Sequence, residues 1–149
     1  MTQNTSEPVW QFQHSVDCNT QRRFAWSYGT DIANWNDPHA SFHLHGPFEP
    51  GTRLTTSLPG QTLHSVIRKV VNGPRSDQAT IDMQLPGAIL SFQWTFENLS
   101  EDRTRITQQL TLSGADADAL LAQASVLEKT TPEGMEKLVA AIERSMKED

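Results

Sequence analysis

Hydrophobic and polar residues alternate along most of the chain, and a helical period replaces this alternation near the end. Between residues 88 and 98, one face carries Leu90, Phe92, Trp94 and Phe96. Between residues 104 and 112, one face carries Ile106, Gln108, Leu110 and Leu112. Because successive side chains of a strand point to opposite faces, both segments predict strands with one dry side and one wet side.

Five further segments predict strands of the same kind. The first begins at Trp10 and places Phe12, His14, Val16 and Cys18 on one face with it. The others are His39–Phe48, Thr52–Leu58, Leu63–Val71 and Gln78–Leu85, separated by Pro-Gly or Asn-Gly-Pro turns. Since these turns leave no room for crossover helices, neighbouring strands are expected to pair as antiparallel hairpins.

Helical patterns follow the first strand and close the chain. Asn19 is the expected N-cap of a short helix that carries Phe24 and ends at Gly29. A weaker apolar stripe follows Gly114, and Thr131 with Pro132 then predicts the start of a separate last helix. The apolar stripe of that helix comprises Met135, Leu138, Val139, Ile142 and Met146. A curved sheet wrapped around this stripe would enclose a pocket.

Composition narrows the class of protein. The chain has 149 residues, a formal net charge of −6 and one cysteine, Cys18, which excludes an intrachain disulfide. Arg22-Arg23 is expected on the exposed side of the first helix, and the chain has no basic cluster, so nucleic-acid binding is not predicted. No apolar run is long enough to cross a membrane, and the polar start is unlike a secretion signal, so a cytoplasmic protein is expected. Met1–Pro8 is predicted to be a flexible tail and residues 9–149 a single ligand-binding domain.

The order of these elements resembles the helix-grip fold of the START-like superfamily, also called Bet v 1-like or SRPBCC. Local segments resemble the polyketide cyclase/dehydrase branch: Trp35-Asn36-Asp37-Pro38, the hairpin 46–53, residues 102–107 and Pro132-Glu133-Gly134-Met135. The resemblance implies an α+β fold, in which an antiparallel sheet of six to seven strands curves around a long C-terminal helix. It also implies a cavity for a small hydrophobic or aromatic molecule. Some relatives catalyse cyclisation or dehydration, and others carry ligands.

The candidate cavity wall combines the dry sheet face with the last helix. Its predicted ligand-binding residues are Trp10, Phe12, His14, Phe42, Met83, Phe92, Trp94, Gln108, Met135, Leu138, Val139 and Ile142. For each of them, ordinary core packing is the alternative. His14 and Gln108 are the polar exceptions, and pairing of the first and last strands would bring them together. His14 is the catalytic candidate, because imidazole works as an acid or a base near neutral pH.

Other polar residues favour plainer interpretations. His39, His43 and His45 share a strand face opposite the apolar one and are expected to point to water, so no metal is predicted. Arg53, Arg68 and Asp82 are expected on the solvated face, and Cys18 is expected to pack.

No cofactor is predicted, because the chain has no phosphate loop, dinucleotide turn, nucleophile elbow or His-Glu-x-x-His motif. The sequence leaves open whether a reaction is catalysed and whether the protein is a monomer or a homodimer. An alternative function is a protein-interaction domain similar to activators of the Hsp90 chaperone, which would need an exposed apolar or charged patch instead of a cavity.

Overall fold

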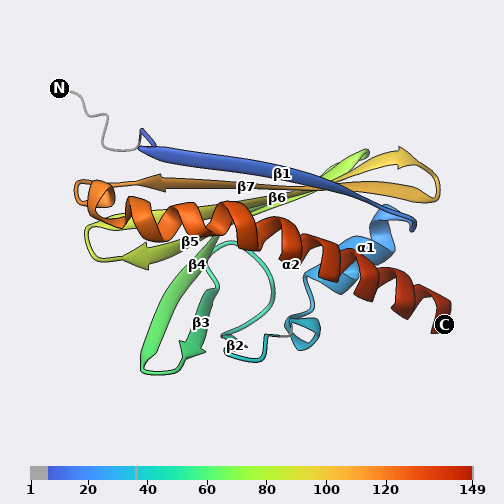
Figure 1. Ribbon diagram of the computed structural model, residues 1–149. Coiled ribbons are helices and arrows are strands. Elements are labelled where there is room, and N and C mark those ends of the chain that lie inside the picture. The colour runs from blue at the N-terminus through green and yellow to red at the C-terminus, as the bar shows by residue number, and fades with distance from the viewer. Residues whose placement is uncertain (1–6, 36, 149) are drawn as a thin grey trace.

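The computed structural model describes residues 7–35 and 37–148, with side chains as far as Lys147. Residues 1–6 of the expected tail and Asn36 of the Trp-Asn-Asp-Pro segment lie outside this description. Within the described residues, seven strands form one antiparallel sheet in the order β1-β7-β6-β5-β4-β3-β2 (Figure 1). The strands are β1 (Trp10–Cys18), β2 (Ser41–Leu44), β3 (Arg53–Leu58), β4 (Gln61–Asn72), β5 (Ser76–Leu85), β6 (Ala88–Ser100) and β7 (Arg103–Ser113).

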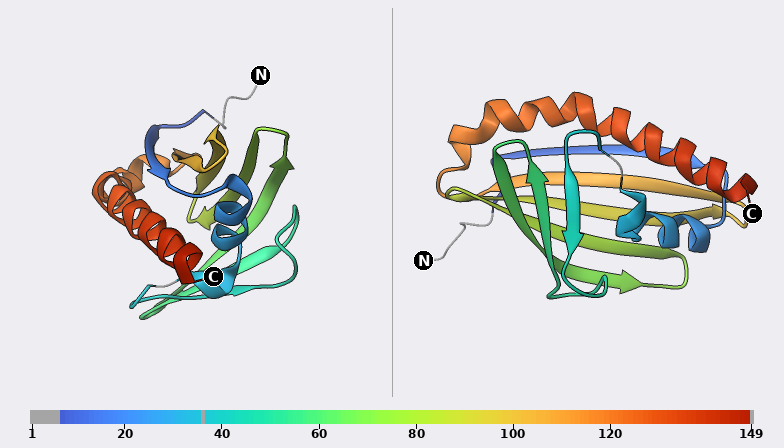
Figure 2. Two further views of the ribbon diagram at one scale, coloured as in Figure 1. Left: turned by 90° about the vertical axis from the view of Figure 1, so that its right-hand side faces the viewer. Right: turned by 90° about the horizontal axis from the view of Figure 1, so that it is seen from below.

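Helical segments lie on one side of this sheet. They are α1 (Arg22–Gly29), the 3₁₀ helices η1 (Ile32–Asn34) and η2 (Ala117–Leu120), and α2 (Leu121–Glu148). The sheet is strongly curved, and α1 and α2 lie on its concave side (Figure 2). The long helix α2 runs beside the edge strand β1 and contacts it. The α+β arrangement expected from the sequence is therefore confirmed.

The sequence predicted seven strands and their antiparallel pairing, but β2 is shorter than expected. The expected segment was His39–Phe48, whereas the strand covers Ser41–Leu44 only. Pro38 and Pro47 flank it, and a proline lacks the amide proton that a sheet ladder requires. Pairing along β2 is confined accordingly to the residues between them.

Two helix boundaries differ from the sequence prediction. The helix α1 begins at Arg22, so Gln21 and not Asn19 is its N-cap residue. The backbone N–H of Asn19 donates to Glu143 Oε2 (2.8 Å). The expected helix start at Thr131 is wrong, because α2 is continuous from Leu121 to Glu148 with Pro132 inside it. Both flanks of Pro132 pack on the molecule through buried residues, Ala124 before it and Met135 after it. This packing holds the helix together across the missing backbone hydrogen bond.

Buried hydrophobic side chains form three clusters. Cluster A lies at the α1 end and comprises Cys18, Ala25, Phe96, Ile106, Met135 and Ile142. Cluster B lies at the η2 end and comprises Ala88, Leu90, Leu112, Ala117 and Ala124. Cluster C lies towards β3 and comprises Leu54, Ile67 and Ile81. The concave face is thus packed at its ends and on the β3 side, which leaves its central positions on β1, β7 and β6 to be considered separately.

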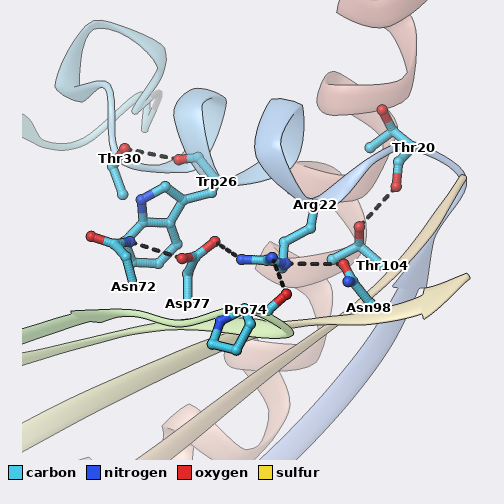
Figure 3. A network of polar contacts seen from close by, with 9 residues as sticks. All are labelled: Thr20, Arg22, Trp26, Thr30, Asn72, Pro74, Asp77, Asn98 and Thr104. Carbon is cyan, nitrogen blue, oxygen red and sulfur yellow. Dashed lines mark hydrogen bonds and ion pairs between the residues drawn. The ribbon is translucent and has the colours of Figure 1, made fainter. Parts of the chain in front are cut away.

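The expectation that Arg22 is a surface residue is wrong, because it anchors α1 to the sheet (Figure 3). Its guanidinium donates to Asp77 Oδ2 (2.6 Å), to Asn98 Oδ1 (2.9 Å) and to the carbonyl of Pro74 (3.0 Å). The other Asp77 oxygen accepts from Asn72 Nδ2 (2.8 Å). Side-chain exposure is 17% for Arg22 and 8% for Asp77. The one carboxylate on the concave side of β5 is therefore neutralised by its own partner.

Candidate ligand-binding site

A row of positions crosses the centre of the concave face. In the sheet register, His14 of β1 lies opposite Gln108 of β7, and Gln108 lies opposite Trp94 of β6. Trp94 in turn lies opposite Ala79 of β5. The expected encounter of His14 and Gln108 therefore occurs, and Trp94 extends it to three adjacent residues. We call His14, Gln108 and Trp94 the polar row.

The rows on either side are apolar. On one side, Phe12, Leu110, Phe92 and Ile81 occupy consecutive positions of the four strands. On the other side, Val16, Ile106 and Phe96 do the same and lead to the paired Asp77. The polar row is therefore a narrow break between two apolar rows on β1, β7 and β6. Such a distribution suits a ligand with a large apolar body and one polar group.

The side chains of the polar row are largely enclosed by the protein but have no hydrogen-bond partners among the described residues. Gln108 is 7% exposed, and His14 and Trp94 are half-buried. Among the described residues, none of these three side chains makes a hydrogen bond, whereas the indole groups of Trp10 and Trp35 donate to Glu128 and to the Gly29 carbonyl. Among the described residues, the fully enclosed side-chain polar atoms without a hydrogen-bond partner are Thr20 Oγ1 and Ser65 Oγ, and neither belongs to the polar row. The polar row thus keeps access to water or to a ligand.

The remaining candidate residues divide among the three clusters. Met135 and Ile142 are fully buried in cluster A, and Trp94, Leu138 and Val139 pack against it. Trp10, Met83 and Phe92 pack against cluster B, and Phe42 packs against cluster C, where its ring lies 5.3 Å from that of Trp35. Phe12 stacks beside Trp10 with ring centroids 6.4 Å apart. Phe42 is therefore separated from the polar row, whereas Phe12, Phe92 and Trp94 adjoin or belong to it.

One polar pair on the concave face was missed by sequence reasoning. Thr56 of β3 and Ser65 of β4 are 6% and 4% exposed and share the concave face with Leu54. The alternation of Leu63, Ser65 and Ile67 along β4 would have identified Ser65, because it places the serine among apolar neighbours. These two hydroxyls make the β3 side of the face more polar than expected.

Two carboxylates of α2 accept hydrogen bonds from β1 and from the residue that follows it. Glu128 accepts from the indole of Trp10 (2.9 Å), and Glu143 accepts from the Asn19 amide (2.8 Å). The described strands place no lysine or arginine on the concave face, since Arg53 is exposed and Arg68 bonds Asp82 on the convex face (2.6 Å). The electrostatic surroundings of the polar row are accordingly neutral to negative.

Two hollows of the described residues lie outside the polar row. One, of about 510 Å³, is lined by Gln21, Arg22 and residues 98–102. The other, of about 290 Å³, is lined by Gln11, Phe12, Gln13 and Gln109 at the β1 edge. Both are open to solvent, and Phe12 is the one candidate residue that borders either. A hollow between the sheet and α2 therefore stays a prediction.

Cys18 and the surface histidines offer no competing catalytic centre. Burial, reinforced by the charge of Glu143, raises the pKa of the Cys18 thiol from 9.0 to about 12. On the opposite face of β1, a hydrogen bond from Arg105 holds the pKa of Asp17 below its ordinary value. His39, His43 and His45 are exposed, and the described residues contain no group of three or more His, Cys, Asp or Glu suited to hold a metal ion.

No described helix has the length and apolar character needed to cross a membrane.

Comparisons with known proteins were informative for structure alone. No protein-family model matches the sequence, and neither does any curated protein. Norcoclaurine synthase from Thalictrum flavum, solved with dopamine and hydroxybenzaldehyde, superposes with a TM-score of 0.69 at 13% identity, covering 93% of this chain and 89% of that one. Zhui aromatase/cyclase from Streptomyces sp. R1128 gives 0.70 at 14% identity, with 92% and 95% covered.

A START superfamily protein from Mycobacterium smegmatis is also similar, with a TM-score of 0.60 at 17% identity and 93% and 97% of the two chains covered. These likenesses extend over almost the whole of each chain, while the sequences have diverged almost completely. At the level of the fold, they confirm the resemblance that the turns and strand junctions of the sequence indicated. The chain has the helix-grip fold of START-like proteins.

Proposed function

We propose that the protein binds a small hydrophobic or aromatic molecule between the concave face of the sheet and α2. The observation that carries this proposal is the polar row, in which Gln108 is 7% exposed, lies among aromatic side chains and makes no side-chain hydrogen bond within the described chain. An amide that has no protein partner and keeps access to water can exchange that water for a polar group of a ligand, which favours a role in binding.

Two structural neighbours support this choice of ligand class. The Thalictrum flavum synthase was solved with dopamine and hydroxybenzaldehyde, which are small aromatic molecules. The Streptomyces protein is an aromatase/cyclase by name. Both share the fold of this chain, and a shared fold transfers a binding mode only as a hypothesis.

A cyclase-like or dehydratase-like reaction in this site would use His14 as its acid or base. Imidazole can take up and release a proton near neutral pH, whereas the Gln108 amide and the Trp94 indole cannot. The polar row holds no second acid or base to share the work. We therefore place ligand binding before turnover as the function.

The alternative of a surface-acting domain similar to Hsp90 activators receives less support. It would need an exposed apolar or charged patch. The exposed large hydrophobic residues of the described chain are Val9, Val71, Leu99, Leu121, Val126 and Met146. They belong to separate segments or to well-spaced positions of α2, which is the ordinary distribution of single surface hydrophobics.

Native mass spectrometry of the freshly purified protein tests the proposal. We expect a fraction of the protein to carry one small molecule, and the emptied protein to bind the neutral fluorophore prodan at one site with a blue-shifted emission. Val139→Trp should weaken prodan binding, because Val139 is half-buried on the sheet side of α2. Val126→Trp is the matched control, since Val126 is 57% exposed on the same helix. A folded protein that binds neither a co-purified molecule nor prodan would contradict the proposal.

A further inference from the structure

We infer that the polar row selects uncharged, ring-containing ligands that carry a hydrogen-bond acceptor oxygen, such as an aryl ketone, and discriminates against carboxylates. The inference rests on the proposed function, because it assigns the ligand chemistry of the same site. It concerns three adjacent residues and the charges around them.

Hydrogen-bonding capacity indicates an acceptor oxygen. The Trp94 indole is a donor only, and the Gln108 amide has two donor hydrogens and one acceptor oxygen. Neither group donates to another described residue. A ketone oxygen has two lone pairs and can therefore accept from both groups. A hydrocarbon in the same place would displace water from these donors without replacing its hydrogen bonds, which costs free energy.

The spacing of the row indicates the size of the ligand body. The three residues occupy neighbouring strands, so the row spans two strand spacings, about 10 Å. Ala79 follows Trp94 on β5, and its methyl group is the smallest side chain along this line. A flat body of two or three fused rings matches this length and would find the indole of Trp94 as a stacking surface.

Charge excludes the anionic alternative. The concave face of the described strands carries no lysine or arginine, and the Asp77 carboxylate is already paired with Arg22. Glu128 and Glu143 border the site, and the chain as a whole has a formal charge of −6. A carboxylate moved into this site would lose its hydration without gaining a lysine or arginine as partner, which is unfavourable.

Three naphthalenes of nearly equal shape test the inference in competition with prodan at pH 8. They are 2-acetonaphthone, 2-isopropylnaphthalene and 2-naphthoate, which differ in the atoms of one branched substituent. We expect the ketone to bind about 10-fold more tightly than the hydrocarbon and the carboxylate to bind at least about 10-fold more weakly than the ketone. In Gln108→Leu, the preference for the ketone over the hydrocarbon should fall to about 2-fold or less. Gln109→Leu, on the convex face, should keep it.

The outcomes separate the two proposals. Equal affinities for ketone and hydrocarbon, both weakened by Val139→Trp, would leave the binding site standing and overturn the role of the polar row. A carboxylate that binds as tightly as the ketone would overturn the selection against charge. Prodan and all three compounds failing to bind the folded protein would overturn the proposed function itself, and this inference with it.

Discussion

At the scale of single residues, Gln108 combines deep burial with an amide that no described residue satisfies. Alternation along β7 predicts its place on the apolar face, and the pairing of first and last strands predicts its neighbour His14. Trp94 was expected as one aromatic among many, and its position in the same row follows only from the β6–β7 register. The row could therefore be predicted in part, because alternation fixes the face of a residue and long-range pairing fixes its neighbours.

Replacing Gln108 by leucine should not destabilise the empty protein, because an amide without a hydrogen-bond partner in the described chain is exchanged for an apolar group of similar size. The measurement is urea unfolding followed by circular dichroism. Gln109→Leu, one position along β7 on the convex face, should change the free energy of unfolding by less than about 0.5 kcal/mol. If Gln108→Leu instead lowered stability by more than about 1 kcal/mol, the amide would have an internal partner and the binding argument would fail.

Cys18 should behave as an inert thiol in the native protein. Its pKa is raised by burial and by Glu143 to about 12, above the ordinary value of 9.0. The neutral thiol is therefore the form that the fold favours, and its contribution to stability is complete below about pH 9 and is lost as the pH rises towards 12. At pH 8, a disulfide reagent should label Cys18 in urea but not in buffer. Rapid stoichiometric labelling of the native protein would show that the thiol is accessible and ionised.

At the scale of elements, α2 depends on packing more than on its own sequence. Pro132 predicted a helix start, because local signals favour proline at the first position of a helix. The structure instead carries one helix through this point, since residues on both sides are buried. The boundary could not be predicted from local sequence, because tertiary contacts decided it.

Glycine exchanges in two elements should have opposite effects. Gly134 lies in α2, and a Cβ there would meet no atom within 4 Å, so Gly134→Ala should raise the free energy of unfolding by about 1 kcal/mol. Gly87, in the β5–β6 turn, has φ +67°, and a Cβ there would collide with the Asp116 carboxylate. Gly87→Ala should therefore be clearly destabilising. Thermal unfolding of the two variants measures the contrast, and equal shifts of the same sign would contradict it.

The attachment of α1 depends on the Arg22–Asp77 pair, which no sequence pattern indicated because its partners lie on distant segments. Arg22→Leu should lower the free energy of unfolding by about 3 kcal/mol, because it leaves the Asp77 carboxylate buried without its cation. Arg22→Leu combined with Asp77→Leu should recover part of this loss. Arg23→Leu is the control, since Arg23 is exposed. Chemical denaturation measures all of them, and equal stability of the Arg22 and Arg23 variants would refute the anchoring role.

At the scale of the whole molecule, one curved sheet and one long helix place a short polar row between apolar rows of the concave face. The order of strands and turns was sufficient to predict this architecture, because short turns impose antiparallel neighbours and a final amphipathic helix needs an apolar face to cover. The sequence was less able to predict which candidate residues lie in the site, because the clusters that fill the ends of the sheet arise from contacts between distant segments.

The most direct test of the account is a titration of the ¹⁵N-labelled protein with 2-acetonaphthone, followed by two-dimensional ¹H–¹⁵N NMR. We expect saturable shifts of the Trp94 indole and of the Gln108 side-chain amide, whereas the Trp35 indole, which donates to the Gly29 carbonyl at 2.8 Å, stays in place. Shifts confined to Gln11, Gln13 and Gln109 at the β1 edge, or no shifts at all, would contradict ligand binding on the concave face.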